Sequence, residues 1–340
     1  MSFVERKRNR VNDQQAMQLA ITAADRARLV SRPNPWVGAV VVTQTGEIFE
    51  GSTCHFGGPH AETEALRVAG GLAVDATIYT TLEPCNHTGK TGPCTEAIIK
   101  AGIKRVVVGI VDPDEKVSGR GIARLREAGI VVDVGICDDE ISTQLQAYIH
   151  HRKTKRPFVV LKMASTLDGR TAAPDGSSVW ITGEIARQRV QNLRAQSDAI
   201  LVGAGTVRID DPMLTVRDID APSPRRIVLG EVSPSARVNP CLQWRGDIAD
   251  LLDELGSQDV LQLLVEGGPT VAATFHRENL IDQYILHLAP AITGGNDSLP
   301  LFEGRGISTM SEMWRGKIKS TQMLGEDLEI IFENTQHNRR

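Results

Sequence analysis

The stretch at 60–94 decides how the first half of this chain is interpreted: it begins with His60-Ala61-Glu62, continues to Pro84-Cys85 and ends with Pro93-Cys94. One imidazole and two thiolates form a donor set that suits zinc, and three protein ligands leave a fourth position open for water. His60, Cys85 and Cys94 are therefore predicted to hold a catalytic rather than a structural Zn²⁺ ion. Glu62 can reach that water without binding the metal, so we expect it to act as general base and acid.

Each part of this motif is a weak indication by itself. A lone histidine usually lies on the surface or in a satisfied core, and a pair of cysteines can simply be buried thiols. The conjunction is more specific, because His-x-Glu followed by Pro-Cys and a second cysteine is similar to the signature of zinc-dependent nucleobase deaminases. Cys94 also begins a predicted helix, and a helix N-terminus stabilises a thiolate.

The composition is that of an ordinary enzyme with two domains. The 340 residues are 41% hydrophobic and 24% charged, which is typical of globular proteins. The formal net charge of -4 gives no electrostatic reason to expect a nucleic-acid partner. Five cysteines, with two assigned to the metal, argue against a disulfide framework and favour a reducing, cytoplasmic location. The basic, polar start of the chain predicts no signal peptide, and no apolar run is long enough to span a membrane.

Helix and strand patterns alternate along the first half. Small apolar residues recur with helical spacing at 14–29, and Thr45-Gly46 is a predicted turn between two short strands. The pattern then predicts helices at 60–67, 94–100 and 121–128, alternating with strands at 76–82, 105–110 and 130–134. Such alternation is typical of an α/β domain with one mostly parallel sheet.

A basic stretch at 150–157, poor in apolar residues, separates two such patterns. It predicts a linker between a first domain at 1–150 and a second at 157–340, with its two histidines exposed to solvent. In the second half, Gly203-Ala204-Gly205 and Gly267-Gly268 each follow a predicted strand. Glycines at such positions let backbone amides approach a phosphate, so the two turns favour a dinucleotide cleft.

Further motifs surround the predicted zinc ligands. They are Asn34-Pro35-Trp36-Val37-Gly38, Thr81-Leu82-Glu83-Pro84-Cys85, His87-Thr88-Gly89-Lys90-Thr91 and Ser118-Gly119-Arg120-Gly121. With them, this half resembles the deaminase half of the bifunctional riboflavin-biosynthesis deaminase/reductases. The resemblance implies a cytidine-deaminase-like three-layer α/β domain that acts on a pyrimidine ribose phosphate. It also implies that Asn34 holds the base, and that His87 and Lys90 lie near the substrate and its phosphate.

The second half resembles the reductase domain of the same family, a dihydrofolate-reductase-like α/β fold that uses NADPH. The resemblance rests on stretches at 162–170, 178–182, 203–206, 210–217 and 265–270. It implies a cofactor site that comprises Ala164, Trp180, Thr206, Asp210, Gly268, Pro269 and Thr270. It implies a substrate site that comprises Ser178, Arg194, Leu214, Arg217 and Glu266, in which the two arginines suit a phosphate. Without the resemblance, Trp180 could be a core residue, Arg194 a charge on a helix surface, and Asp210 a turn residue.

The chain also departs from the usual pattern of this family. Thr53 stands where the family has a histidine, and Asp114 stands where it has an asparagine, which predicts an additional negative charge near an anionic substrate. The sequence is shortened between about 230 and 260, where only one helix, at 248–255, is predicted. Glu231 replaces a small hydroxyl residue, and because a carboxylate repels a phosphate we expect weakened NADPH binding.

The leading hypothesis is an enzyme of riboflavin synthesis. It would deaminate 2,5-diamino-6-(5-phosphoribosylamino)pyrimidin-4-one at a zinc site and then reduce the ribosyl group to ribityl with NADPH. One alternative is a nucleoside or nucleobase deaminase with an inactive or regulatory C-terminal nucleotide-binding domain. Another is a nucleotide-binding regulatory protein with a structural zinc, in which Glu62 would be idle. We expect a homo-oligomer with a small-molecule substrate, and neither a nucleic-acid nor a membrane partner.

Overall fold

The computed structural model describes residues 11–87 and 92–334, and the chain divides into two compact units, the first ending at Thr154 and the second starting at Lys155. The predicted linker is not an extended segment. It overlaps α6 (Gln146–Thr154), which contains both of its histidines. Tyr148 and His151, three residues apart on this helix, are both 3% exposed. The expectation that both histidines are solvated is therefore wrong, because His151 lies on the buried side of a helix. The many basic residues in this stretch gave no indication of that buried side.

A mixed sheet forms the centre of the first unit, with the strand order β2-β1-β3-β4-β5 among the described residues. Its strands are β1 (Gly38–Val42), β2 (Ile48–Ser52), β3 (Thr77–Leu82), β4 (Arg105–Ile110) and β5 (Val131–Val134). β3, β4 and β5 are parallel, but β1 runs antiparallel to both β2 and β3. The prediction of a mostly parallel sheet is therefore wrong for its β1 side. The turn at Gly46 reverses the chain after β1, and the following crossover places β3 on the other side of β1.

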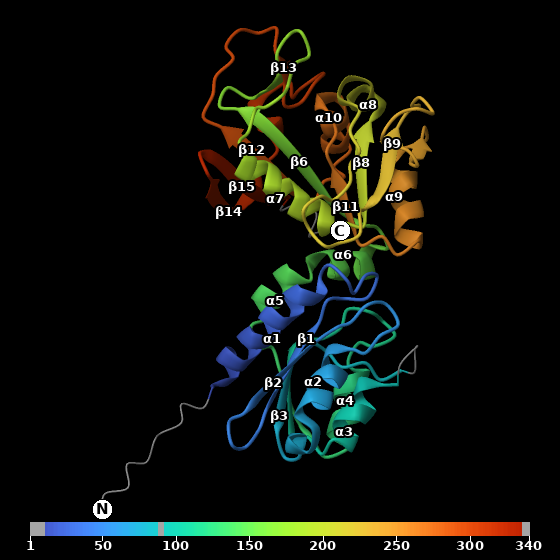
Figure 1. Ribbon diagram of the computed structural model, residues 1–340, viewed down its shortest axis with the longest axis vertical. Helices are drawn as coiled ribbons and strands as arrows, with labels where there is room; N and C mark the ends of the chain where they lie inside the picture. Colours follow the sequence, from blue (N-terminus) through green and yellow to red (C-terminus); the bar gives the residue numbers. More distant parts are fainter. Residues whose placement is uncertain (1–10, 88–91, 335–340) are drawn as a thin grey trace, which may run out of the picture. The chain divides into compact units, whose positions relative to one another are not determined.

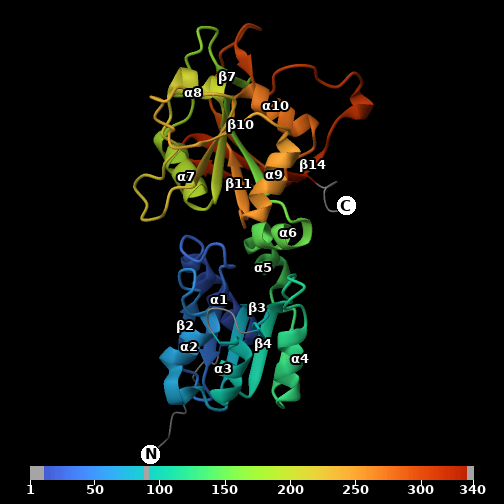
Figure 2. The same cartoon turned by 90° about the vertical axis from the view of Figure 1, so that its right-hand side faces the viewer.

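Helices cover both faces of this sheet and make the unit a three-layer structure (Figure 1). They are α1 (Asp13–Ala27), α2 (Ala61–Ala69) with a 3₁₀ turn (Gly70–Ala73), α3 (Cys94–Lys100), α4 (Arg120–Glu127) and α5 (Asp138–Gln144). Figure 2 shows α2, α3 and α4 side by side on one face. The layers approach closely at glycines, since a Cβ atom on Gly51 would lie 2.2 Å from the carbonyl oxygen of Ala61. This contact fixes the start of α2 against the sheet.

The described part of the second unit contains a larger sheet with the order β10-β9-β8-β11-β6-β12-β15-β14. The strands from β10 to β12 in this order are parallel, whereas β15 and β14 are antiparallel and form one edge. The bounds are β6 (Phe158–Thr166), β8 (Ala199–Gly203), β9 (Arg225–Leu229), β10 (Leu242–Trp244), β11 (Gln262–Val265), β12 (Gln283–Ala289), β14 (Gly316–Leu324) and β15 (Asp327–Asn334). Two short strands, β7 (Arg170–Ala172) and β13 (Leu299–Pro300), pair separately.

The helices of this unit are α7 (Glu184–Ala195), α8 (Ala204–Asp210), α9 (Ile248–Ser257) and α10 (Pro269–Arg277), with a 3₁₀ turn (Met310–Glu312). α7 lies on the opposite side of β11 from α9 and α10 (Figure 2). Leu251 of α9 and Phe275 of α10 are fully buried in a hydrophobic cluster with Leu201 and Leu263 of the sheet. The helix predicted at 248–255 is present, but the shortened segment also forms β10, which was not predicted. None of the described helices is both long and apolar enough to cross a membrane.

Candidate active sites

The three predicted zinc ligands come together in the first unit. His60 immediately precedes α2, Cys85 lies beyond the end of β3, and Cys94 is the first residue of α3. His60 Nδ1 lies 3.3 Å from the Sγ atom of Cys94 and 3.6 Å from that of Cys85, and the three ligand atoms all lie within 4.8 Å of one another. A tetrahedral zinc ion with Zn–N and Zn–S bonds of about 2.0 and 2.3 Å separates its ligand atoms by roughly 3.5 Å. The residues present therefore fit this ion.

The local electrostatics of these residues also suit a metal-assisted reaction. The hydrogen bond with Cys94 lowers the pKa of Cys85 to about 4, so one sulfur already carries the negative charge that a cation requires. Glu62 lies in the first turn of α2 and is 3% exposed. Burial raises the pKa of Glu62 to about 7, against the opposing charge of His60. A carboxyl group that binds and releases protons near neutral pH is suited to general acid–base catalysis.

A second carboxylate near the metal site, that of Glu83, is occupied by the backbone. Its Oε2 atom accepts hydrogen bonds from the N–H groups of Asp112 at 3.2 Å and Gly119 at 2.9 Å. Its Oε1 atom accepts from the N–H groups of Gly121 at 2.9 Å and Ile122 at 3.2 Å. The bonds from Gly119, Gly121 and Ile122 satisfy donors at the start of α4 that no helical partner can reach, and the bond from Asp112 holds the segment after β4. Glu83 thus joins the end of β3 to α4.

A cavity of about 310 Å³ opens onto His60 and Glu62. Asn34 and His87, both predicted to lie near the substrate, line this cavity. Lys90, the third such residue, lies outside the described residues. Thr53 lines the cavity where the family has a histidine, but its Oγ1 atom accepts a hydrogen bond from the backbone N–H of Val37 at 3.2 Å. This hydroxyl is therefore engaged by the protein itself.

Three further residues of this cavity were missed by the sequence reasoning: Asp112, Tyr148 and Arg152. The Tyr148 hydroxyl donates a hydrogen bond to Asp112 Oδ1 at 3.0 Å, and burial raises the pKa of Asp112 to about 6. Arg152 Nε lies 3.6 Å from Oδ2 of Asp114, so the additional negative charge expected there has a cationic partner. The four-residue spacing of Tyr148 and Arg152 was the available signal, because it places both on one side of a helix.

The second unit has a cavity of about 1,400 Å³. Sites for one small ligand usually measure roughly 300–1,000 Å³, so this cavity has room for a dinucleotide and a second molecule. Its walls include all the predicted cofactor residues and four of the five predicted substrate residues, namely Ala164, Trp180, Thr206, Asp210, Gly268, Pro269, Thr270, Ser178, Arg194, Arg217 and Glu266. Leu214 does not line this cavity. Its side chain is 3% exposed, so it is a packing residue of the unit.

A buried ion pair lies at the centre of the predicted substrate residues. The Nε and Nη2 atoms of Arg194 donate to Oε1 and Oε2 of Glu266, both at 2.8 Å, and the two side chains are only 13% and 14% exposed. Although burial opposes it, the charge of Arg194 holds the pKa of Glu266 below its usual range. Lys162, which was not predicted as a site residue, lines the same cavity, and burial lowers its pKa. Arg194 is therefore not a simple charge on a helix surface.

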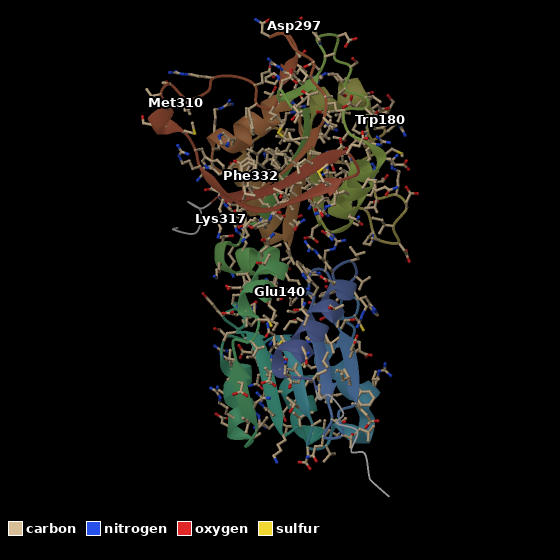
Figure 3. All side chains as sticks on the ribbon, turned by 90° about the vertical axis from the view of Figure 1, so that its left-hand side faces the viewer. Glu140, Trp180, Asp297, Met310, Lys317 and Phe332 are labelled. Carbon is tan, nitrogen blue, oxygen red and sulfur yellow. The ribbon has the colours of Figure 1, made fainter. Side chains whose placement is uncertain are left out.

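The outer wall of the cavity contains exposed side chains. Trp180 is 71% exposed and lies at the surface of the unit in Figure 3, so it is not a core residue. The guanidinium carbon of Arg187 lies 4.5 Å from the centre of its ring, a cation–π contact. Asp210 is the last residue of α8, and burial raises its pKa.

Glu231 lines the cavity as expected, but a cation accompanies it. Glu231 forms an ion pair with Arg245, which follows β10 and lines the same cavity, and both side chains are 67% exposed. The carboxylate therefore has a cationic partner, and the weakened NADPH binding expected of it stays a prediction. The sequence missed this pair because β10 was not predicted, and β10 is the element that brings Arg245 beside Glu231.

Family models match both units. The model described as "Cytidine and deoxycytidylate deaminase zinc-binding region" matches residues 10–110, and the "RibD C-terminal domain" model matches residues 157–330. One unit holds three metal-ligating residues beside a buried glutamate, and the other holds a cavity with room for a dinucleotide. Together they define a zinc-dependent deaminase joined to a reductase.

Similar proteins extend over nearly the whole chain. "Riboflavin biosynthesis protein RibD" of Aquifex aeolicus is 38% identical over 352 residues, covering 94% of this chain and 98% of that protein. The Escherichia coli protein of the same name is 36% identical over 361 residues, with coverages of 94% and 98%. This chain belongs to the RibD family of bifunctional riboflavin-biosynthesis deaminase/reductases.

Solved structures agree with this assignment. Acinetobacter baumannii RibD, form 1, has a TM-score of 0.90 at 38% identity and covers 95% of this chain and 99% of that one. A Thermotoga maritima deaminase/reductase has a TM-score of 0.85 at 35% identity, with coverages of 94% and 98%. The predicted family, fold class, zinc and NADPH cofactors, and pair of activities are confirmed. Deaminase and oxidoreductase chemistry are thus combined in one chain, and the regulatory alternatives do not apply.

Proposed function

We propose that the first unit deaminates 2,5-diamino-6-(5-phosphoribosylamino)pyrimidin-4-one and that the second unit reduces the ribosyl group of the product to ribityl. The Thermotoga structure is described as a diaminohydroxyphosphoribosylaminopyrimidine deaminase and 5-amino-6-(5-phosphoribosylamino)uracil reductase, which supports this substrate. The observation that carries the proposal is the juxtaposition of Glu62 with His60, Cys85 and Cys94 beneath a cavity lined by polar residues.

In the deamination, water adds to the amino-bearing ring carbon and ammonia leaves. A zinc ion held by His60, Cys85 and Cys94 supplies Lewis acidity and makes a bound water more acidic. Glu62 takes a proton from the attacking water and delivers a proton to the departing amine. Asn34 and His87 orient the pyrimidine from the cavity wall. The burial of Glu62 shields its carboxyl group from bulk solvent.

In the reduction, the ribosyl carbon that is bonded to the exocyclic amino nitrogen of the pyrimidine accepts a hydride, with the sugar in its open-chain or imine form. NADPH supplies this hydride when it is bound. The glycine turns after β8 and β11 let the backbone approach its phosphates, and Thr206 and Thr270 line the cavity beside them. Glu266, held by Arg194, accepts hydrogen bonds from the ribityl hydroxyls, and Arg217 binds the phosphate of the substrate.

Other properties are proposals of the same kind. We propose that the functional domains are 1–150 and 157–340, as the sequence predicts, that the protein is cytoplasmic, and that nucleic acid is not a partner. A homo-oligomer is supported by β14, a nine-residue edge strand that is exposed over nearly all its length. Ile318 and Met323 on this strand are both 61% exposed. Figure 3 labels Lys317 on the same strand, at the margin of the sheet. Exposed apolar side chains on an edge strand are suited to pairing with a second copy.

One assay tests the substrate and the order of the two steps. The purified chain, loaded with zinc, is incubated with the diaminopyrimidine substrate in the presence or absence of NADPH, and both products are followed. We expect ammonia and the deaminated ribosyl compound without NADPH, and the ribityl compound only when NADPH is added. Reduction that precedes deamination, or deamination of free cytidine at the same rate, would contradict the proposal.

A further inference from the structure

Arg152 is a cation in the wall of the deaminase cavity that no part of the reaction described above uses. It lies on α6, far along the chain from the metal motif, yet it lines the same cavity as His60 and Glu62. Its side chain is only 19% exposed. An arginine with so little exposure loses much of its hydration. Its ion pair with an anion in the cavity is therefore stronger than the ion pair of the same anion with a fully solvated lysine.

Two neighbours fix the position of this guanidinium group. Oδ2 of Asp114 lies 3.6 Å from Arg152 Nε, and the ring of Tyr148 lies beneath the guanidinium carbon, 5.0 Å from it. Tyr148 is itself fixed, because its hydroxyl donates a hydrogen bond to Asp112. The distance to Asp114 is longer than the 2.7–2.9 Å of a strong charge-assisted hydrogen bond. Asp114 therefore orients Arg152 through its charge rather than through a strong hydrogen bond.

The charge of the cavity makes Arg152 important for an anionic substrate. Glu62, Asp112 and Asp114 line the wall with carboxyl groups, and among its described residues Arg152 is the only arginine or lysine. A phosphate that entered elsewhere along this wall would meet like charges, which repel it at short distance. A guanidinium group has the planar geometry that pairs with two phosphate oxygens at once.

We propose that Arg152 binds the phosphate of the deaminase substrate, and that Tyr148 and Asp114 are positioning residues that hold its guanidinium group ready. The proposal rests on the phosphorylated substrate of the proposed function. It also gives a role to Asp114, which stands where the family has an asparagine, because its carboxylate orients the guanidinium group of Arg152. Arg152 thereby selects a phosphorylated pyrimidine over the corresponding nucleoside.

The test compares two variants on two substrates. Full-length, zinc-loaded Arg152→Gln and Lys153→Gln are assayed for deamination of the phosphorylated substrate and of its dephosphorylated nucleoside. The Lys153 variant removes the same charge from the same helix, but Lys153 does not line the cavity. For Arg152→Gln we expect KM for the phosphorylated substrate to rise by on the order of 30-fold, with kcat changed by less than about threefold. For the nucleoside, and for Lys153→Gln on either substrate, changes of less than about threefold are expected.

The two substrates separate binding of the phosphate from a general effect on the fold. An equal loss on both substrates, or an unchanged KM for the phosphorylated one, would overturn the proposal. Arg152→Lys provides a second measurement, and it should recover part of the preference for the phosphorylated substrate because it keeps the charge but loses the bidentate geometry. Failure of wild type to deaminate the phosphorylated substrate would instead reject the proposed function itself.

Discussion

The two active sites are built in different ways. The deaminase site is a small cavity whose reacting groups come from a single strand and the two helices beside it, all within 35 residues of sequence at 60–94. The reductase site is a cavity of about 1,400 Å³ whose walls come from β6, α7, β8, α8, β9 and β11, spread over more than 100 residues. The first site therefore depends on a few residues whose chemistry no other side chain can supply. The second depends on the shape formed by several neighbouring strands and the segments that follow them. Changes to the reacting groups of the first site should act on chemistry, and changes to the walls of the second should act on binding and stability.

The largest effect is expected at the buried carboxyl group of the deaminase. Glu62→Gln should keep the zinc ion, because Glu62 is not a ligand, and should lower deamination by on the order of a hundredfold or more, the scale of general acid–base catalysis. Metal analysis and deamination rates measure the two parts separately. NADPH-dependent reduction of the deaminated product is the internal control and should be unchanged. Near-normal deamination by this variant would show that another group moves the proton.

The second effect tests whether the reductase cavity depends on its buried ion pair for stability. Arg194→Met should lower the free energy of unfolding of the second unit by about 3 kcal/mol, because the carboxylate of Glu266 is left without its partner. Tryptophan fluorescence during urea unfolding reports mainly on this unit, which contains Trp180, Trp244 and Trp314. Arg277→Met, which removes an exposed arginine of α10, is the matched control and should have little effect. Equal stabilities of the two variants would mean that Lys162 compensates for the lost charge.

The third effect tests whether the deaminase unit is complete without the reductase unit. A fragment ending at Thr154 should fold and deaminate at a rate within about threefold of the full chain, since independent compact units of this size usually fold alone. A fragment ending at Leu145 lacks α6, and therefore Tyr148 and Arg152, and should lose at least about tenfold in kcat/KM for the phosphorylated substrate. A soluble, zinc-loaded fragment ending at Thr154 that is inactive would show that the deaminase needs the second unit.

The smallest effect concerns the exposed ion pair at the edge of the reductase cavity. Glu231→Ser should leave Arg245 free to meet a cofactor phosphate and tighten NADPH binding by roughly threefold, whereas Arg245→Ser should weaken it to a similar extent, as exposed pairs are worth little. Calorimetric titration at low and high salt provides the measurement, and both effects should diminish at high salt. Unchanged affinity in both variants would place this pair away from the bound cofactor.

The sequence predicted the deaminase site better than the reductase site, for a physical reason. The ligands His60, Cys85 and Cys94 are positioned by consecutive local elements, so their spacing along the chain already restricts their geometry. The walls of the reductase cavity are brought together only by the pairing of distant strands. The resemblance to a known family could indicate which residues line that cavity, but it could not indicate the Arg194–Glu266 pair, which depends on how α7 faces β11.

The errors also have physical causes. The basic composition at 150–157 resembled a linker, because the buried residues of α6 are Ala147, Tyr148 and His151 and include no large aliphatic side chain. The sheet was expected to be mostly parallel, but β1 runs antiparallel both to its hairpin partner β2 and to β3. Leu214 was carried over with its neighbours from the family motif; its side chain is buried and does not line the cavity, so its contact with the substrate stays a prediction.

The carboxylate of Glu83 has a consequence for how the deaminase unit opens to solvent. Its two oxygens hold four backbone amides, on Asp112, Gly119, Gly121 and Ile122. Because one side chain protects all four, these amides should exchange their hydrogens for deuterium together, in a single cooperative opening, rather than one by one from the end of α4. The same opening would release the strand that leads to Cys85. Amide exchange at the start of α4 would thus report on the motion of the metal ligand Cys85, which is not part of that helix.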